Sequence, residues 1–171
     1  MNLKLETISQ LRNLANMFVL ANTQSSLVVL LHGDLGVGKT TFVQFVLGFL
    51  GCNDSVKSPT YNILNEYNVN GKVIYHFDLY RIDRKADLDQ IGLNDCIFQE
   101  NSLSFIEWGC GKELSADIVV ELSYSGQESQ SIDEFNFLGL QSARNACFRP
   151  LSPVGNIVLN CLYGFISGKF A

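Results

Sequence analysis

The stretch HGDLGVGKTT, residues 32–41, follows the apolar run SLVVLL and constrains the fold more than any other part of the sequence. Glycine weakens regular secondary structure, so three glycines in ten residues indicate a backbone that must stay uncovered. The uninterrupted apolar run before them is typical of a buried, parallel strand. Apolar residues between Thr40 and Leu50 predict a strongly apolar helix, with Gly51 as its stop. We therefore expect a strand, a glycine-rich loop and a helix, in that order.

The loop matches the pattern G-x-x-x-x-G-K-[ST], a phosphate-binding loop (P-loop). Backbone N–H groups in such a loop point inward around a phosphate chain, and the following helix amino terminus favours anions. We expect Lys39, solvated without ligand, to bridge the β- and γ-phosphates, and the Thr40 hydroxyl to coordinate Mg²⁺. No Asn-Lys-x-Asp element of guanine-binding proteins occurs, which favours ATP. The predicted ATP-binding residues are Gly33, Asp34, Leu35, Gly36, Val37, Gly38, Lys39, Thr40 and Thr41.

The remaining pattern predicts one α/β domain at residues 1–140. Thr7 and Gln10 form a capping box before an amphipathic helix, and Asn70-Gly71 predicts a hairpin turn between two strands. SLSFIEW and DIVVELSY read as further strands, KADLDQIG as a short helix and FNFLGL as another strand. The expected fold is P-loop NTPase-like, a mixed, mainly parallel sheet with flanking helices and an inserted β-hairpin. Residues 141–171 form a carboxyl-terminal extension of uncertain structure, in which VGNIVLNCLYGFISG is expected to pack on the core.

Charge and cysteine content argue against several classes of protein. A net charge of −5 and a pI near 4.9 disfavour direct binding to nucleic acid or to a membrane surface. The five cysteines are scattered and form no CxxC pair, which favours free thiols in a reducing compartment. The amino terminus lacks the unbroken apolar core of a signal peptide. We therefore expect a cytoplasmic protein.

Two predicted strands end in acids. VIYHFD ends at Asp78 and LSFIE at Glu107, and both should lie at the carboxyl edge of the sheet, where ligand sites of α/β proteins form. Hydrolysis requires a held metal and a positioned water, and carboxylates at this edge can serve both. We name Asp78 and Glu107 as candidate catalytic residues and, with Thr40, as candidate metal ligands. Ordinary solvated carboxylates at strand ends remain the alternative.

The segment SPTY contains Ser58, Pro59 and Thr60, between the P-loop helix and the hairpin. Thr60 could reach Mg²⁺ or the γ-phosphate from a switch-like loop, although a plain turn set by the proline is the simpler interpretation of this segment alone. His76 shares a strand face with Asp78 and is more simply a packed histidine. Tyr80 and Arg81 follow, and Arg81 could contact phosphate or a partner, or be solvated.

Taken together, GDLGVGKTT, SPTY, YHFDLYRI and FIEW resemble the TsaE family in order and spacing over about residues 5–125. The resemblance implies a small bacterial P-loop ATPase that supports threonylcarbamoyl modification of adenosine 37 in tRNAs reading ANN codons, alongside TsaD and TsaB. TsaD would carry out the transfer, and the ATPase would reset the complex between turnovers. The resemblance also implies that Thr40 and Asp78 serve Mg²⁺ and that Glu107 and Trp108 form the acidic edge of the site. An acidic chain would then reach tRNA through its partners.

The sequence departs from this family in GCGKEL after Trp108 and in the tail from Gln141, which leaves the partner contacts open. A small-molecule kinase is one alternative, although the chain has few arginines for a lid. A nucleotide-gated binding module with negligible hydrolysis is the other. Phosphate release with and without the partners would separate that module from an ATPase.

Overall fold

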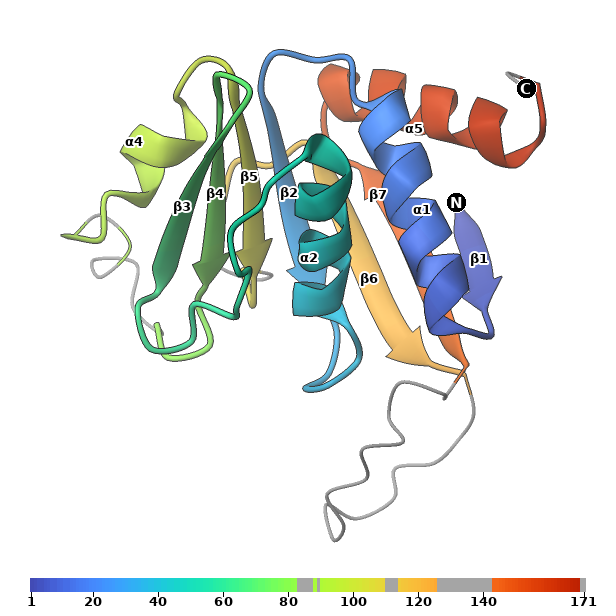
Figure 1. The fold of residues 1–171 in the computed structure, drawn as a ribbon, viewed down its shortest axis with the longest axis horizontal. Helices are drawn as coiled ribbons and strands as arrows, with labels where there is room; N and C mark the ends of the chain where they lie inside the picture. The colour runs from blue at the N-terminus through green and yellow to red at the C-terminus, as the bar shows by residue number, and fades with distance from the viewer. Residues whose placement is uncertain (83–87, 89, 110–113, 126–142, 170–171) are drawn as a thin grey trace, which may run out of the picture.

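The described residues of the computed structural model contain a seven-stranded mixed sheet with the order β1-β7-β6-β2-β5-β4-β3 (Figure 1). These residues are 1–82, 88, 90–109, 114–125 and 143–169. Four central strands run parallel, and antiparallel strands lie on both sides of them. The strands are β1 (Asn2–Leu5), β2 (Leu27–His32), β3 (Leu64–Val69), β4 (Lys72–Asp78), β5 (Ser102–Glu107), β6 (Ile118–Tyr124) and β7 (Arg144–Pro150). The expected α/β fold with a parallel centre and an added hairpin is confirmed.

Helices cover both faces of the sheet. Residues of β2 alternate between two hydrophobic clusters, so both faces of this central strand are buried. One cluster contains buried side chains of α1 (Ile8–Ala21), α2 (Lys39–Leu50) and α5 (Pro153–Ile166). The other contains those of the short α4 (Leu93–Ile97). This double burial explains why the sequence of β2 reads as an unbroken apolar run.

Local sequence signals set several element boundaries. The side chain of Thr7 caps α1, and the side chain of Gln10 completes the capping box. Asn70 and Gly71 both have positive φ, 53° and 79°, as expected for the tight hairpin between β3 and β4. Gly51 ends α2 in the left-handed conformation. These expectations are confirmed. The sequence could predict them because each feature depends on a few neighbouring residues.

The segment after residue 141, whose structure the sequence left open, contributes to the same sheet. β7 pairs antiparallel with β6 on one side and with β1 on the other. Residues 154–166 of the expected packing segment lie in α5, and buried residues of this helix join the cluster that also contains α1, which confirms the expected packing. FNFLGL and half of KADLDQIG (positions 85–87 and 89) lie outside the described residues, as do positions 110–113 of GCGKEL.

A single aspartate joins α5 to the sheet. The Asp117 carboxylate accepts hydrogen bonds from the Val28 N–H at 2.9 Å and from the Ser152 hydroxyl at 2.5 Å. Ser152 also caps α5, because its hydroxyl oxygen accepts from the Gly155 N–H. The start of β2 and the start of α5 are therefore fixed to the same side chain.

No helix in the described part of the chain is long and apolar enough to cross a membrane. The four cysteines within that part (Cys52, Cys96, Cys147 and Cys161) are free thiols.

Candidate functional site

The loop between β2 and α2 lies at the carboxyl ends of the parallel strands (Figure 1). Its backbone requires glycine at two positions for different reasons. A Cβ on Gly33 would lie 2.1 Å from the backbone oxygen of Leu122, so no larger residue fits there. Gly38 precedes the first residue of α2 in the left-handed conformation, with φ 111°. The glycines thus let the loop turn tightly from the sheet into the helix.

Lys39, the first residue of α2, folds back over the loop. Its ammonium donates hydrogen bonds to the carbonyls of Gly33 at 2.7 Å and Asp34 at 2.9 Å, and lies 4.1 Å from the centre of the Trp108 ring. The residue is 5% exposed, so the expectation of a solvated lysine is wrong. Burial lowers the pKa of Lys39, and the nearby carboxylates, Glu107 first among them, act in the opposite direction. The ammonium is held within the loop by contacts that an anion could replace.

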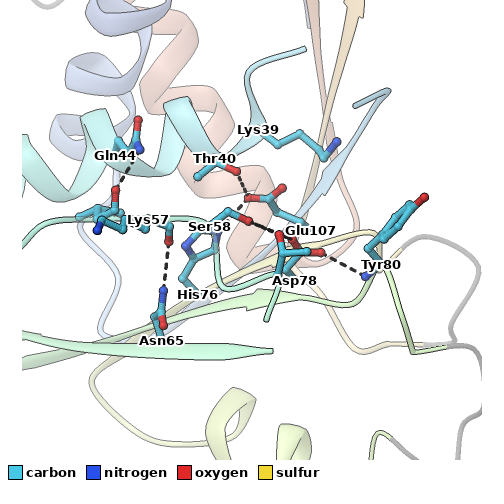
Figure 2. A network of polar contacts seen from close by, with 12 residues as sticks. Lys39, Thr40, Gln44, Lys57, Ser58, Asn65, His76, Asp78, Tyr80 and Glu107 are labelled. Atoms are coloured by element: carbon cyan, nitrogen blue, oxygen red, sulfur yellow. Dashed lines mark hydrogen bonds and ion pairs between the residues drawn. The ribbon is translucent and has the colours of Figure 1, made fainter. Parts of the chain in front are cut away.

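Asp78 ends β4, and its carboxylate accepts hydrogen bonds from the hydroxyls of the switch-like loop. Its Oδ2 accepts a hydrogen bond from Thr60 Oγ1 at 2.6 Å. The same Oδ2 accepts from Ser58 Oγ at 3.0 Å, and Oδ1 accepts from the Tyr80 N–H at 3.1 Å (Figure 2). Pro59 between the two hydroxyls is buried, and its carbonyl accepts hydrogen bonds from two following N–H groups. The Asp78 carboxylate therefore holds the switch-like loop of Ser58, Pro59 and Thr60 against the end of β4.

Glu107 ends β5, directly beside Asp78 in the parallel register. Its Oε1 accepts a 2.7 Å hydrogen bond from Thr40 Oγ1 and lies 2.9 Å from His76 Nε2 (Figure 2). The side chains of His76 and Glu107 are both buried. The sequence-based interpretation of His76 as a packed histidine omitted this contact. The histidine holds the carboxylate from within the sheet, while Thr40 contacts it from the helix.

Trp108 leaves β5 with a positive φ of 61°, which is uncommon for a bulky side chain and often marks a functional site. The turn places its ring against Lys39 and also against the ring of Tyr80, with 5.1 Å between the two ring centres. Arg81 lies over the Tyr61 ring, with 5.0 Å from its guanidinium carbon to the ring centre. The structure thus brings Trp108 into the site and leaves Tyr80 at its rim.

A cleft of about 290 Å³ lies between the loop and the two acids. Several predicted site residues do not line it. Asp34 contributes no lining side chain and accepts from Lys39 through its backbone carbonyl, Val37 points into the core, and Pro59, Tyr80 and Arg81 lie outside. The lining residues are Leu35, Gly36, Gly38, Lys39, Thr40, Thr41, Ser58, Thr60, Asp78, Glu107 and Trp108.

The donors around the cleft fit a phosphate chain with a magnesium ion. Mg²⁺ prefers oxygen ligands and is usually held by one or two carboxylates together with substrate phosphates. A threonine hydroxyl and two carboxylates line the cleft beside a helix amino terminus and a lysine. Within the described ranges, no cluster of three or more His, Cys, Asp or Glu could hold a metal ion by itself.

Comparison with known proteins decides the family. The family profile described as "Threonylcarbamoyl adenosine biosynthesis protein TsaE" matches residues 5–132. The chain belongs to the TsaE family. A protein of Haemophilus influenzae named "tRNA threonylcarbamoyladenosine biosynthesis protein TsaE" is 41% identical over 116 residues, which cover 66% of this chain and 73% of that protein. A Bacillus subtilis protein of the same name is 38% identical over 81 residues, 47% of this chain and 49% of that protein.

A solved structure supports the fold. The structure titled "Crystal structure of Bacillus subtilus YdiB" matches with a TM-score of 0.74 and 20% identity, covering 97% of this chain and 95% of that one. The TsaE family match ends at residue 132, whereas the structural match extends across nearly the whole chain. β7 and α5 are therefore included in the shared fold.

Sequence reasoning assigned no role in the site to His76 or Arg144, although both contact residues of the site. The alternation of β4 placed His76 on the face of Asp78, but its contact with Glu107 could not be predicted because Glu107 belongs to another strand. No sequence motif pointed to Arg144. It lies beyond the family match, and only the tertiary structure brings it to the phosphate-binding loop.

Proposed function

We propose that this protein binds ATP with Mg²⁺ in the cleft, hydrolyses it slowly, and thereby supports threonylcarbamoyl modification of adenosine 37 in tRNAs reading ANN codons. The observation that carries the proposal is the convergence of Lys39, Thr40, Asp78 and Glu107 on one cleft beside the amino terminus of α2. Family membership and the names of the relatives support the tRNA role.

Lys39 and the loop would bind the phosphates. The ammonium is close to the loop and already desolvated, so exchanging two carbonyl partners for phosphate oxygens requires little reorganisation. The amino terminus of α2 contributes backbone N–H groups and the positive end of its dipole. Both contributions favour the anionic ligand over water.

Thr40 and Asp78 would hold Mg²⁺ through their oxygens. When bound, the ion neutralises charge on the phosphate oxygens. To serve as a ligand, the Thr40 hydroxyl would have to give up its hydrogen bond to Glu107. Asp78 Oδ2 would have to bind the ion in addition to the hydroxyls of Ser58 and Thr60, or in place of them. Metal binding would therefore change the contacts of the switch-like loop.

Glu107 would orient the attacking water. Oε1 accepts from Thr40 and His76, whereas Oε2 accepts no hydrogen bond within the described part of the chain. Once the Thr40 hydroxyl is withdrawn, His76 still fixes the carboxylate, so Glu107 remains directed at the cleft. A carboxylate held in this way can accept a proton from water.

TsaD and TsaB are the proposed partners, and tRNA would be reached through them. The chain carries a net charge of −5, and neutralising phosphates requires many lysines and arginines. Nucleotide-dependent release of Ser58 and Thr60 from Asp78 would provide the means by which ATP changes partner affinity.

A nucleotide-gated binding module is the second candidate. The hydrogen bonds from Ser58 and Thr60 to Asp78 favour it, because such a module needs only the release of this loop when ATP binds, without hydrolysis. A small-molecule kinase is less well supported, since no arginine is among the described residues that line the cleft.

Phosphate release by the purified chain, alone and with TsaD and TsaB from the same organism, tests the proposal. An ATPase releases phosphate slowly alone and faster with the partners. A binding module shows ATP-dependent association with the partners but no release above that of Lys39→Ala. The absence of both release and ATP-dependent association would contradict the proposal.

A further inference from the structure

Arg144, the first residue of β7, reaches under the phosphate-binding loop. Its Nε donates a 2.8 Å hydrogen bond to the carbonyl of Val37, 107 residues away in the chain. The residue is 2% exposed, and among the described residues it is the largest of the fully buried side chains. A buried guanidinium is costly unless it is well bonded, so its position against the loop is a specific structural feature.

The hydrogen bond controls the orientation of one peptide plane. The carbonyl of Val37 and the N–H of Gly38 belong to the same trans peptide and point in opposite directions. With the carbonyl fixed to Arg144 beneath the loop, the Gly38 N–H is directed to the other side. Gly38 lines the cleft, so that side is the one where phosphates would lie.

Gly38 has no side chain to restrict this peptide. A glycine visits positive and negative φ with similar ease, so the plane could rotate if its carbonyl were free. The Gly38 carbonyl is itself fixed, since it accepts from the Phe42 N–H at 2.9 Å in the first turn of α2. The helix therefore fixes the peptide that follows Gly38, and Arg144 fixes the peptide that precedes it.

Other contacts hold Arg144 in place beneath the loop. Its guanidinium carbon lies 5.9 Å from the centre of the Tyr124 ring, and Tyr124 pairs with Arg144 across β6 and β7. The Tyr124 hydroxyl in turn lies 3.4 Å from the point that a Cβ on Gly36 would occupy. The loop thus rests on two neighbouring side chains, one from each strand.

We propose that Arg144 is a positioning residue for the nucleotide, holding the peptide between Val37 and Gly38 so that the Gly38 N–H faces the phosphates. This rests on the proposed binding of ATP at the cleft. The residue contributes to affinity without touching the ligand, and its positive charge beneath the loop adds to the attraction for an anion.

Nucleotide affinity of Arg144→Met and Arg144→Lys, measured by calorimetric titration with ATP and with ADP, tests the proposal. Arg144→Met should weaken both nucleotides by a similar factor of about tenfold, because both carry the phosphates that the loop binds. KM for ATP should rise while kcat is nearly unchanged, since Asp78 and Glu107 are unaffected. Arg144→Lys keeps a donor and a charge and should recover part of the affinity.

Arg149→Met is the matched control. Arg149 lies in the same strand, its side chain is 59% exposed, and it pairs at 3.7 Å with Glu121, away from the loop. This variant should bind both nucleotides as wild type does. Wild-type affinity in folded Arg144→Met would overturn the proposal, as would a fall in kcat with unchanged KM.

One further measurement, together with the wild-type titration, covers the remaining outcomes. If neither Arg144 variant folds, the scalar coupling across the hydrogen bond between Arg144 Nε and the Val37 carbonyl carbon can be measured by NMR in wild type. Its presence with and without ATP supports the proposal, and its absence with ATP bound overturns it. If wild type binds no ATP, the proposed function fails; if wild type binds but the Arg144 variants match it, only the positioning role fails.

Discussion

The ammonium of Lys39 lies 4.1 Å from the centre of the Trp108 ring, so the lysine of the loop and the sequence's single tryptophan are in direct contact. A cation over an aromatic face is stabilised by the ring quadrupole, and the contact is lost if the ammonium turns toward phosphates. The tryptophan therefore reports on the position of the lysine.

ATP with Mg²⁺ should change the fluorescence of Trp108, because binding moves Lys39 off the ring. Adenosine, which lacks phosphates, should leave the spectrum unchanged. The measurement is a titration of intrinsic emission, with Lys39→Met as a variant whose unliganded spectrum should already resemble the bound state. Identical spectra with and without saturating ATP would show that the lysine stays on the ring.

Asp78→Ala should reduce hydrolysis by about a hundredfold while leaving much of the ATP affinity in place. The carboxylate is the proposed partner of Mg²⁺, whereas the phosphates are bound mainly by the loop. Phosphate release measured across a range of Mg²⁺ concentrations should lose its metal dependence. If hydrolysis matched that of wild type, the metal role would pass to Glu107.

Thr60→Ala should weaken the preference of TsaD and TsaB for the ATP-bound form more than it weakens ATP binding. The hydroxyl ties the loop to Asp78 at 2.6 Å, and we expect it to exchange that partner when ATP and Mg²⁺ bind. Thr60→Ser keeps the hydroxyl and serves as the control. Pull-down with ATP and with ADP measures the preference; equal capture by the wild type in both states would rule out the switch.

Gly155→Ala should destabilise the fold by about 1–3 kcal/mol, because the new Cβ would lie 2.0 Å from the backbone oxygen of Asp117. Gly48→Ala is the matched control in another helix. Apart from its chain neighbours and the backbone of its own helix, no described atom lies within 4 Å of the added Cβ, so the substitution should stabilise α2 by about 0.5–1 kcal/mol. Chemical denaturation measures both, and equal effects of the two substitutions would contradict the packing of α5 on the sheet.

Sequence reasoning predicted the parts of the site that depend on neighbouring residues. The glycine-rich loop, the hairpin turn at Asn70 and the capping box at Thr7 each follow from local backbone chemistry. The strand-end positions of Asp78 and Glu107 follow from apolar strands that both run to the carboxyl edge of the sheet. These predictions needed no knowledge of which strands are neighbours.

Contacts between distant segments could not be predicted in this way. The pairing of His76 with Glu107 requires that β4 and β5 lie side by side, and Arg144 reaches Val37 only because β7 is placed between β1 and β6. The burial of Lys39 likewise depends on the turn after Glu107, which brings Trp108 over the loop. Tertiary structure, rather than local preference, determines all three.

Calorimetric titration of ATP with Mg²⁺ into wild type and Lys39→Ala tests the central claim most directly. Wild type should bind, and the variant should lose at least about tenfold in affinity, which corresponds to about 1.4 kcal/mol, while a thermal melt checks that it remains folded. Lys4→Ala is the control, since Lys4 is exposed and pairs only with Glu6 among the ion pairs of the described residues. Wild-type ATP affinity in folded Lys39→Ala would contradict nucleotide binding at this loop.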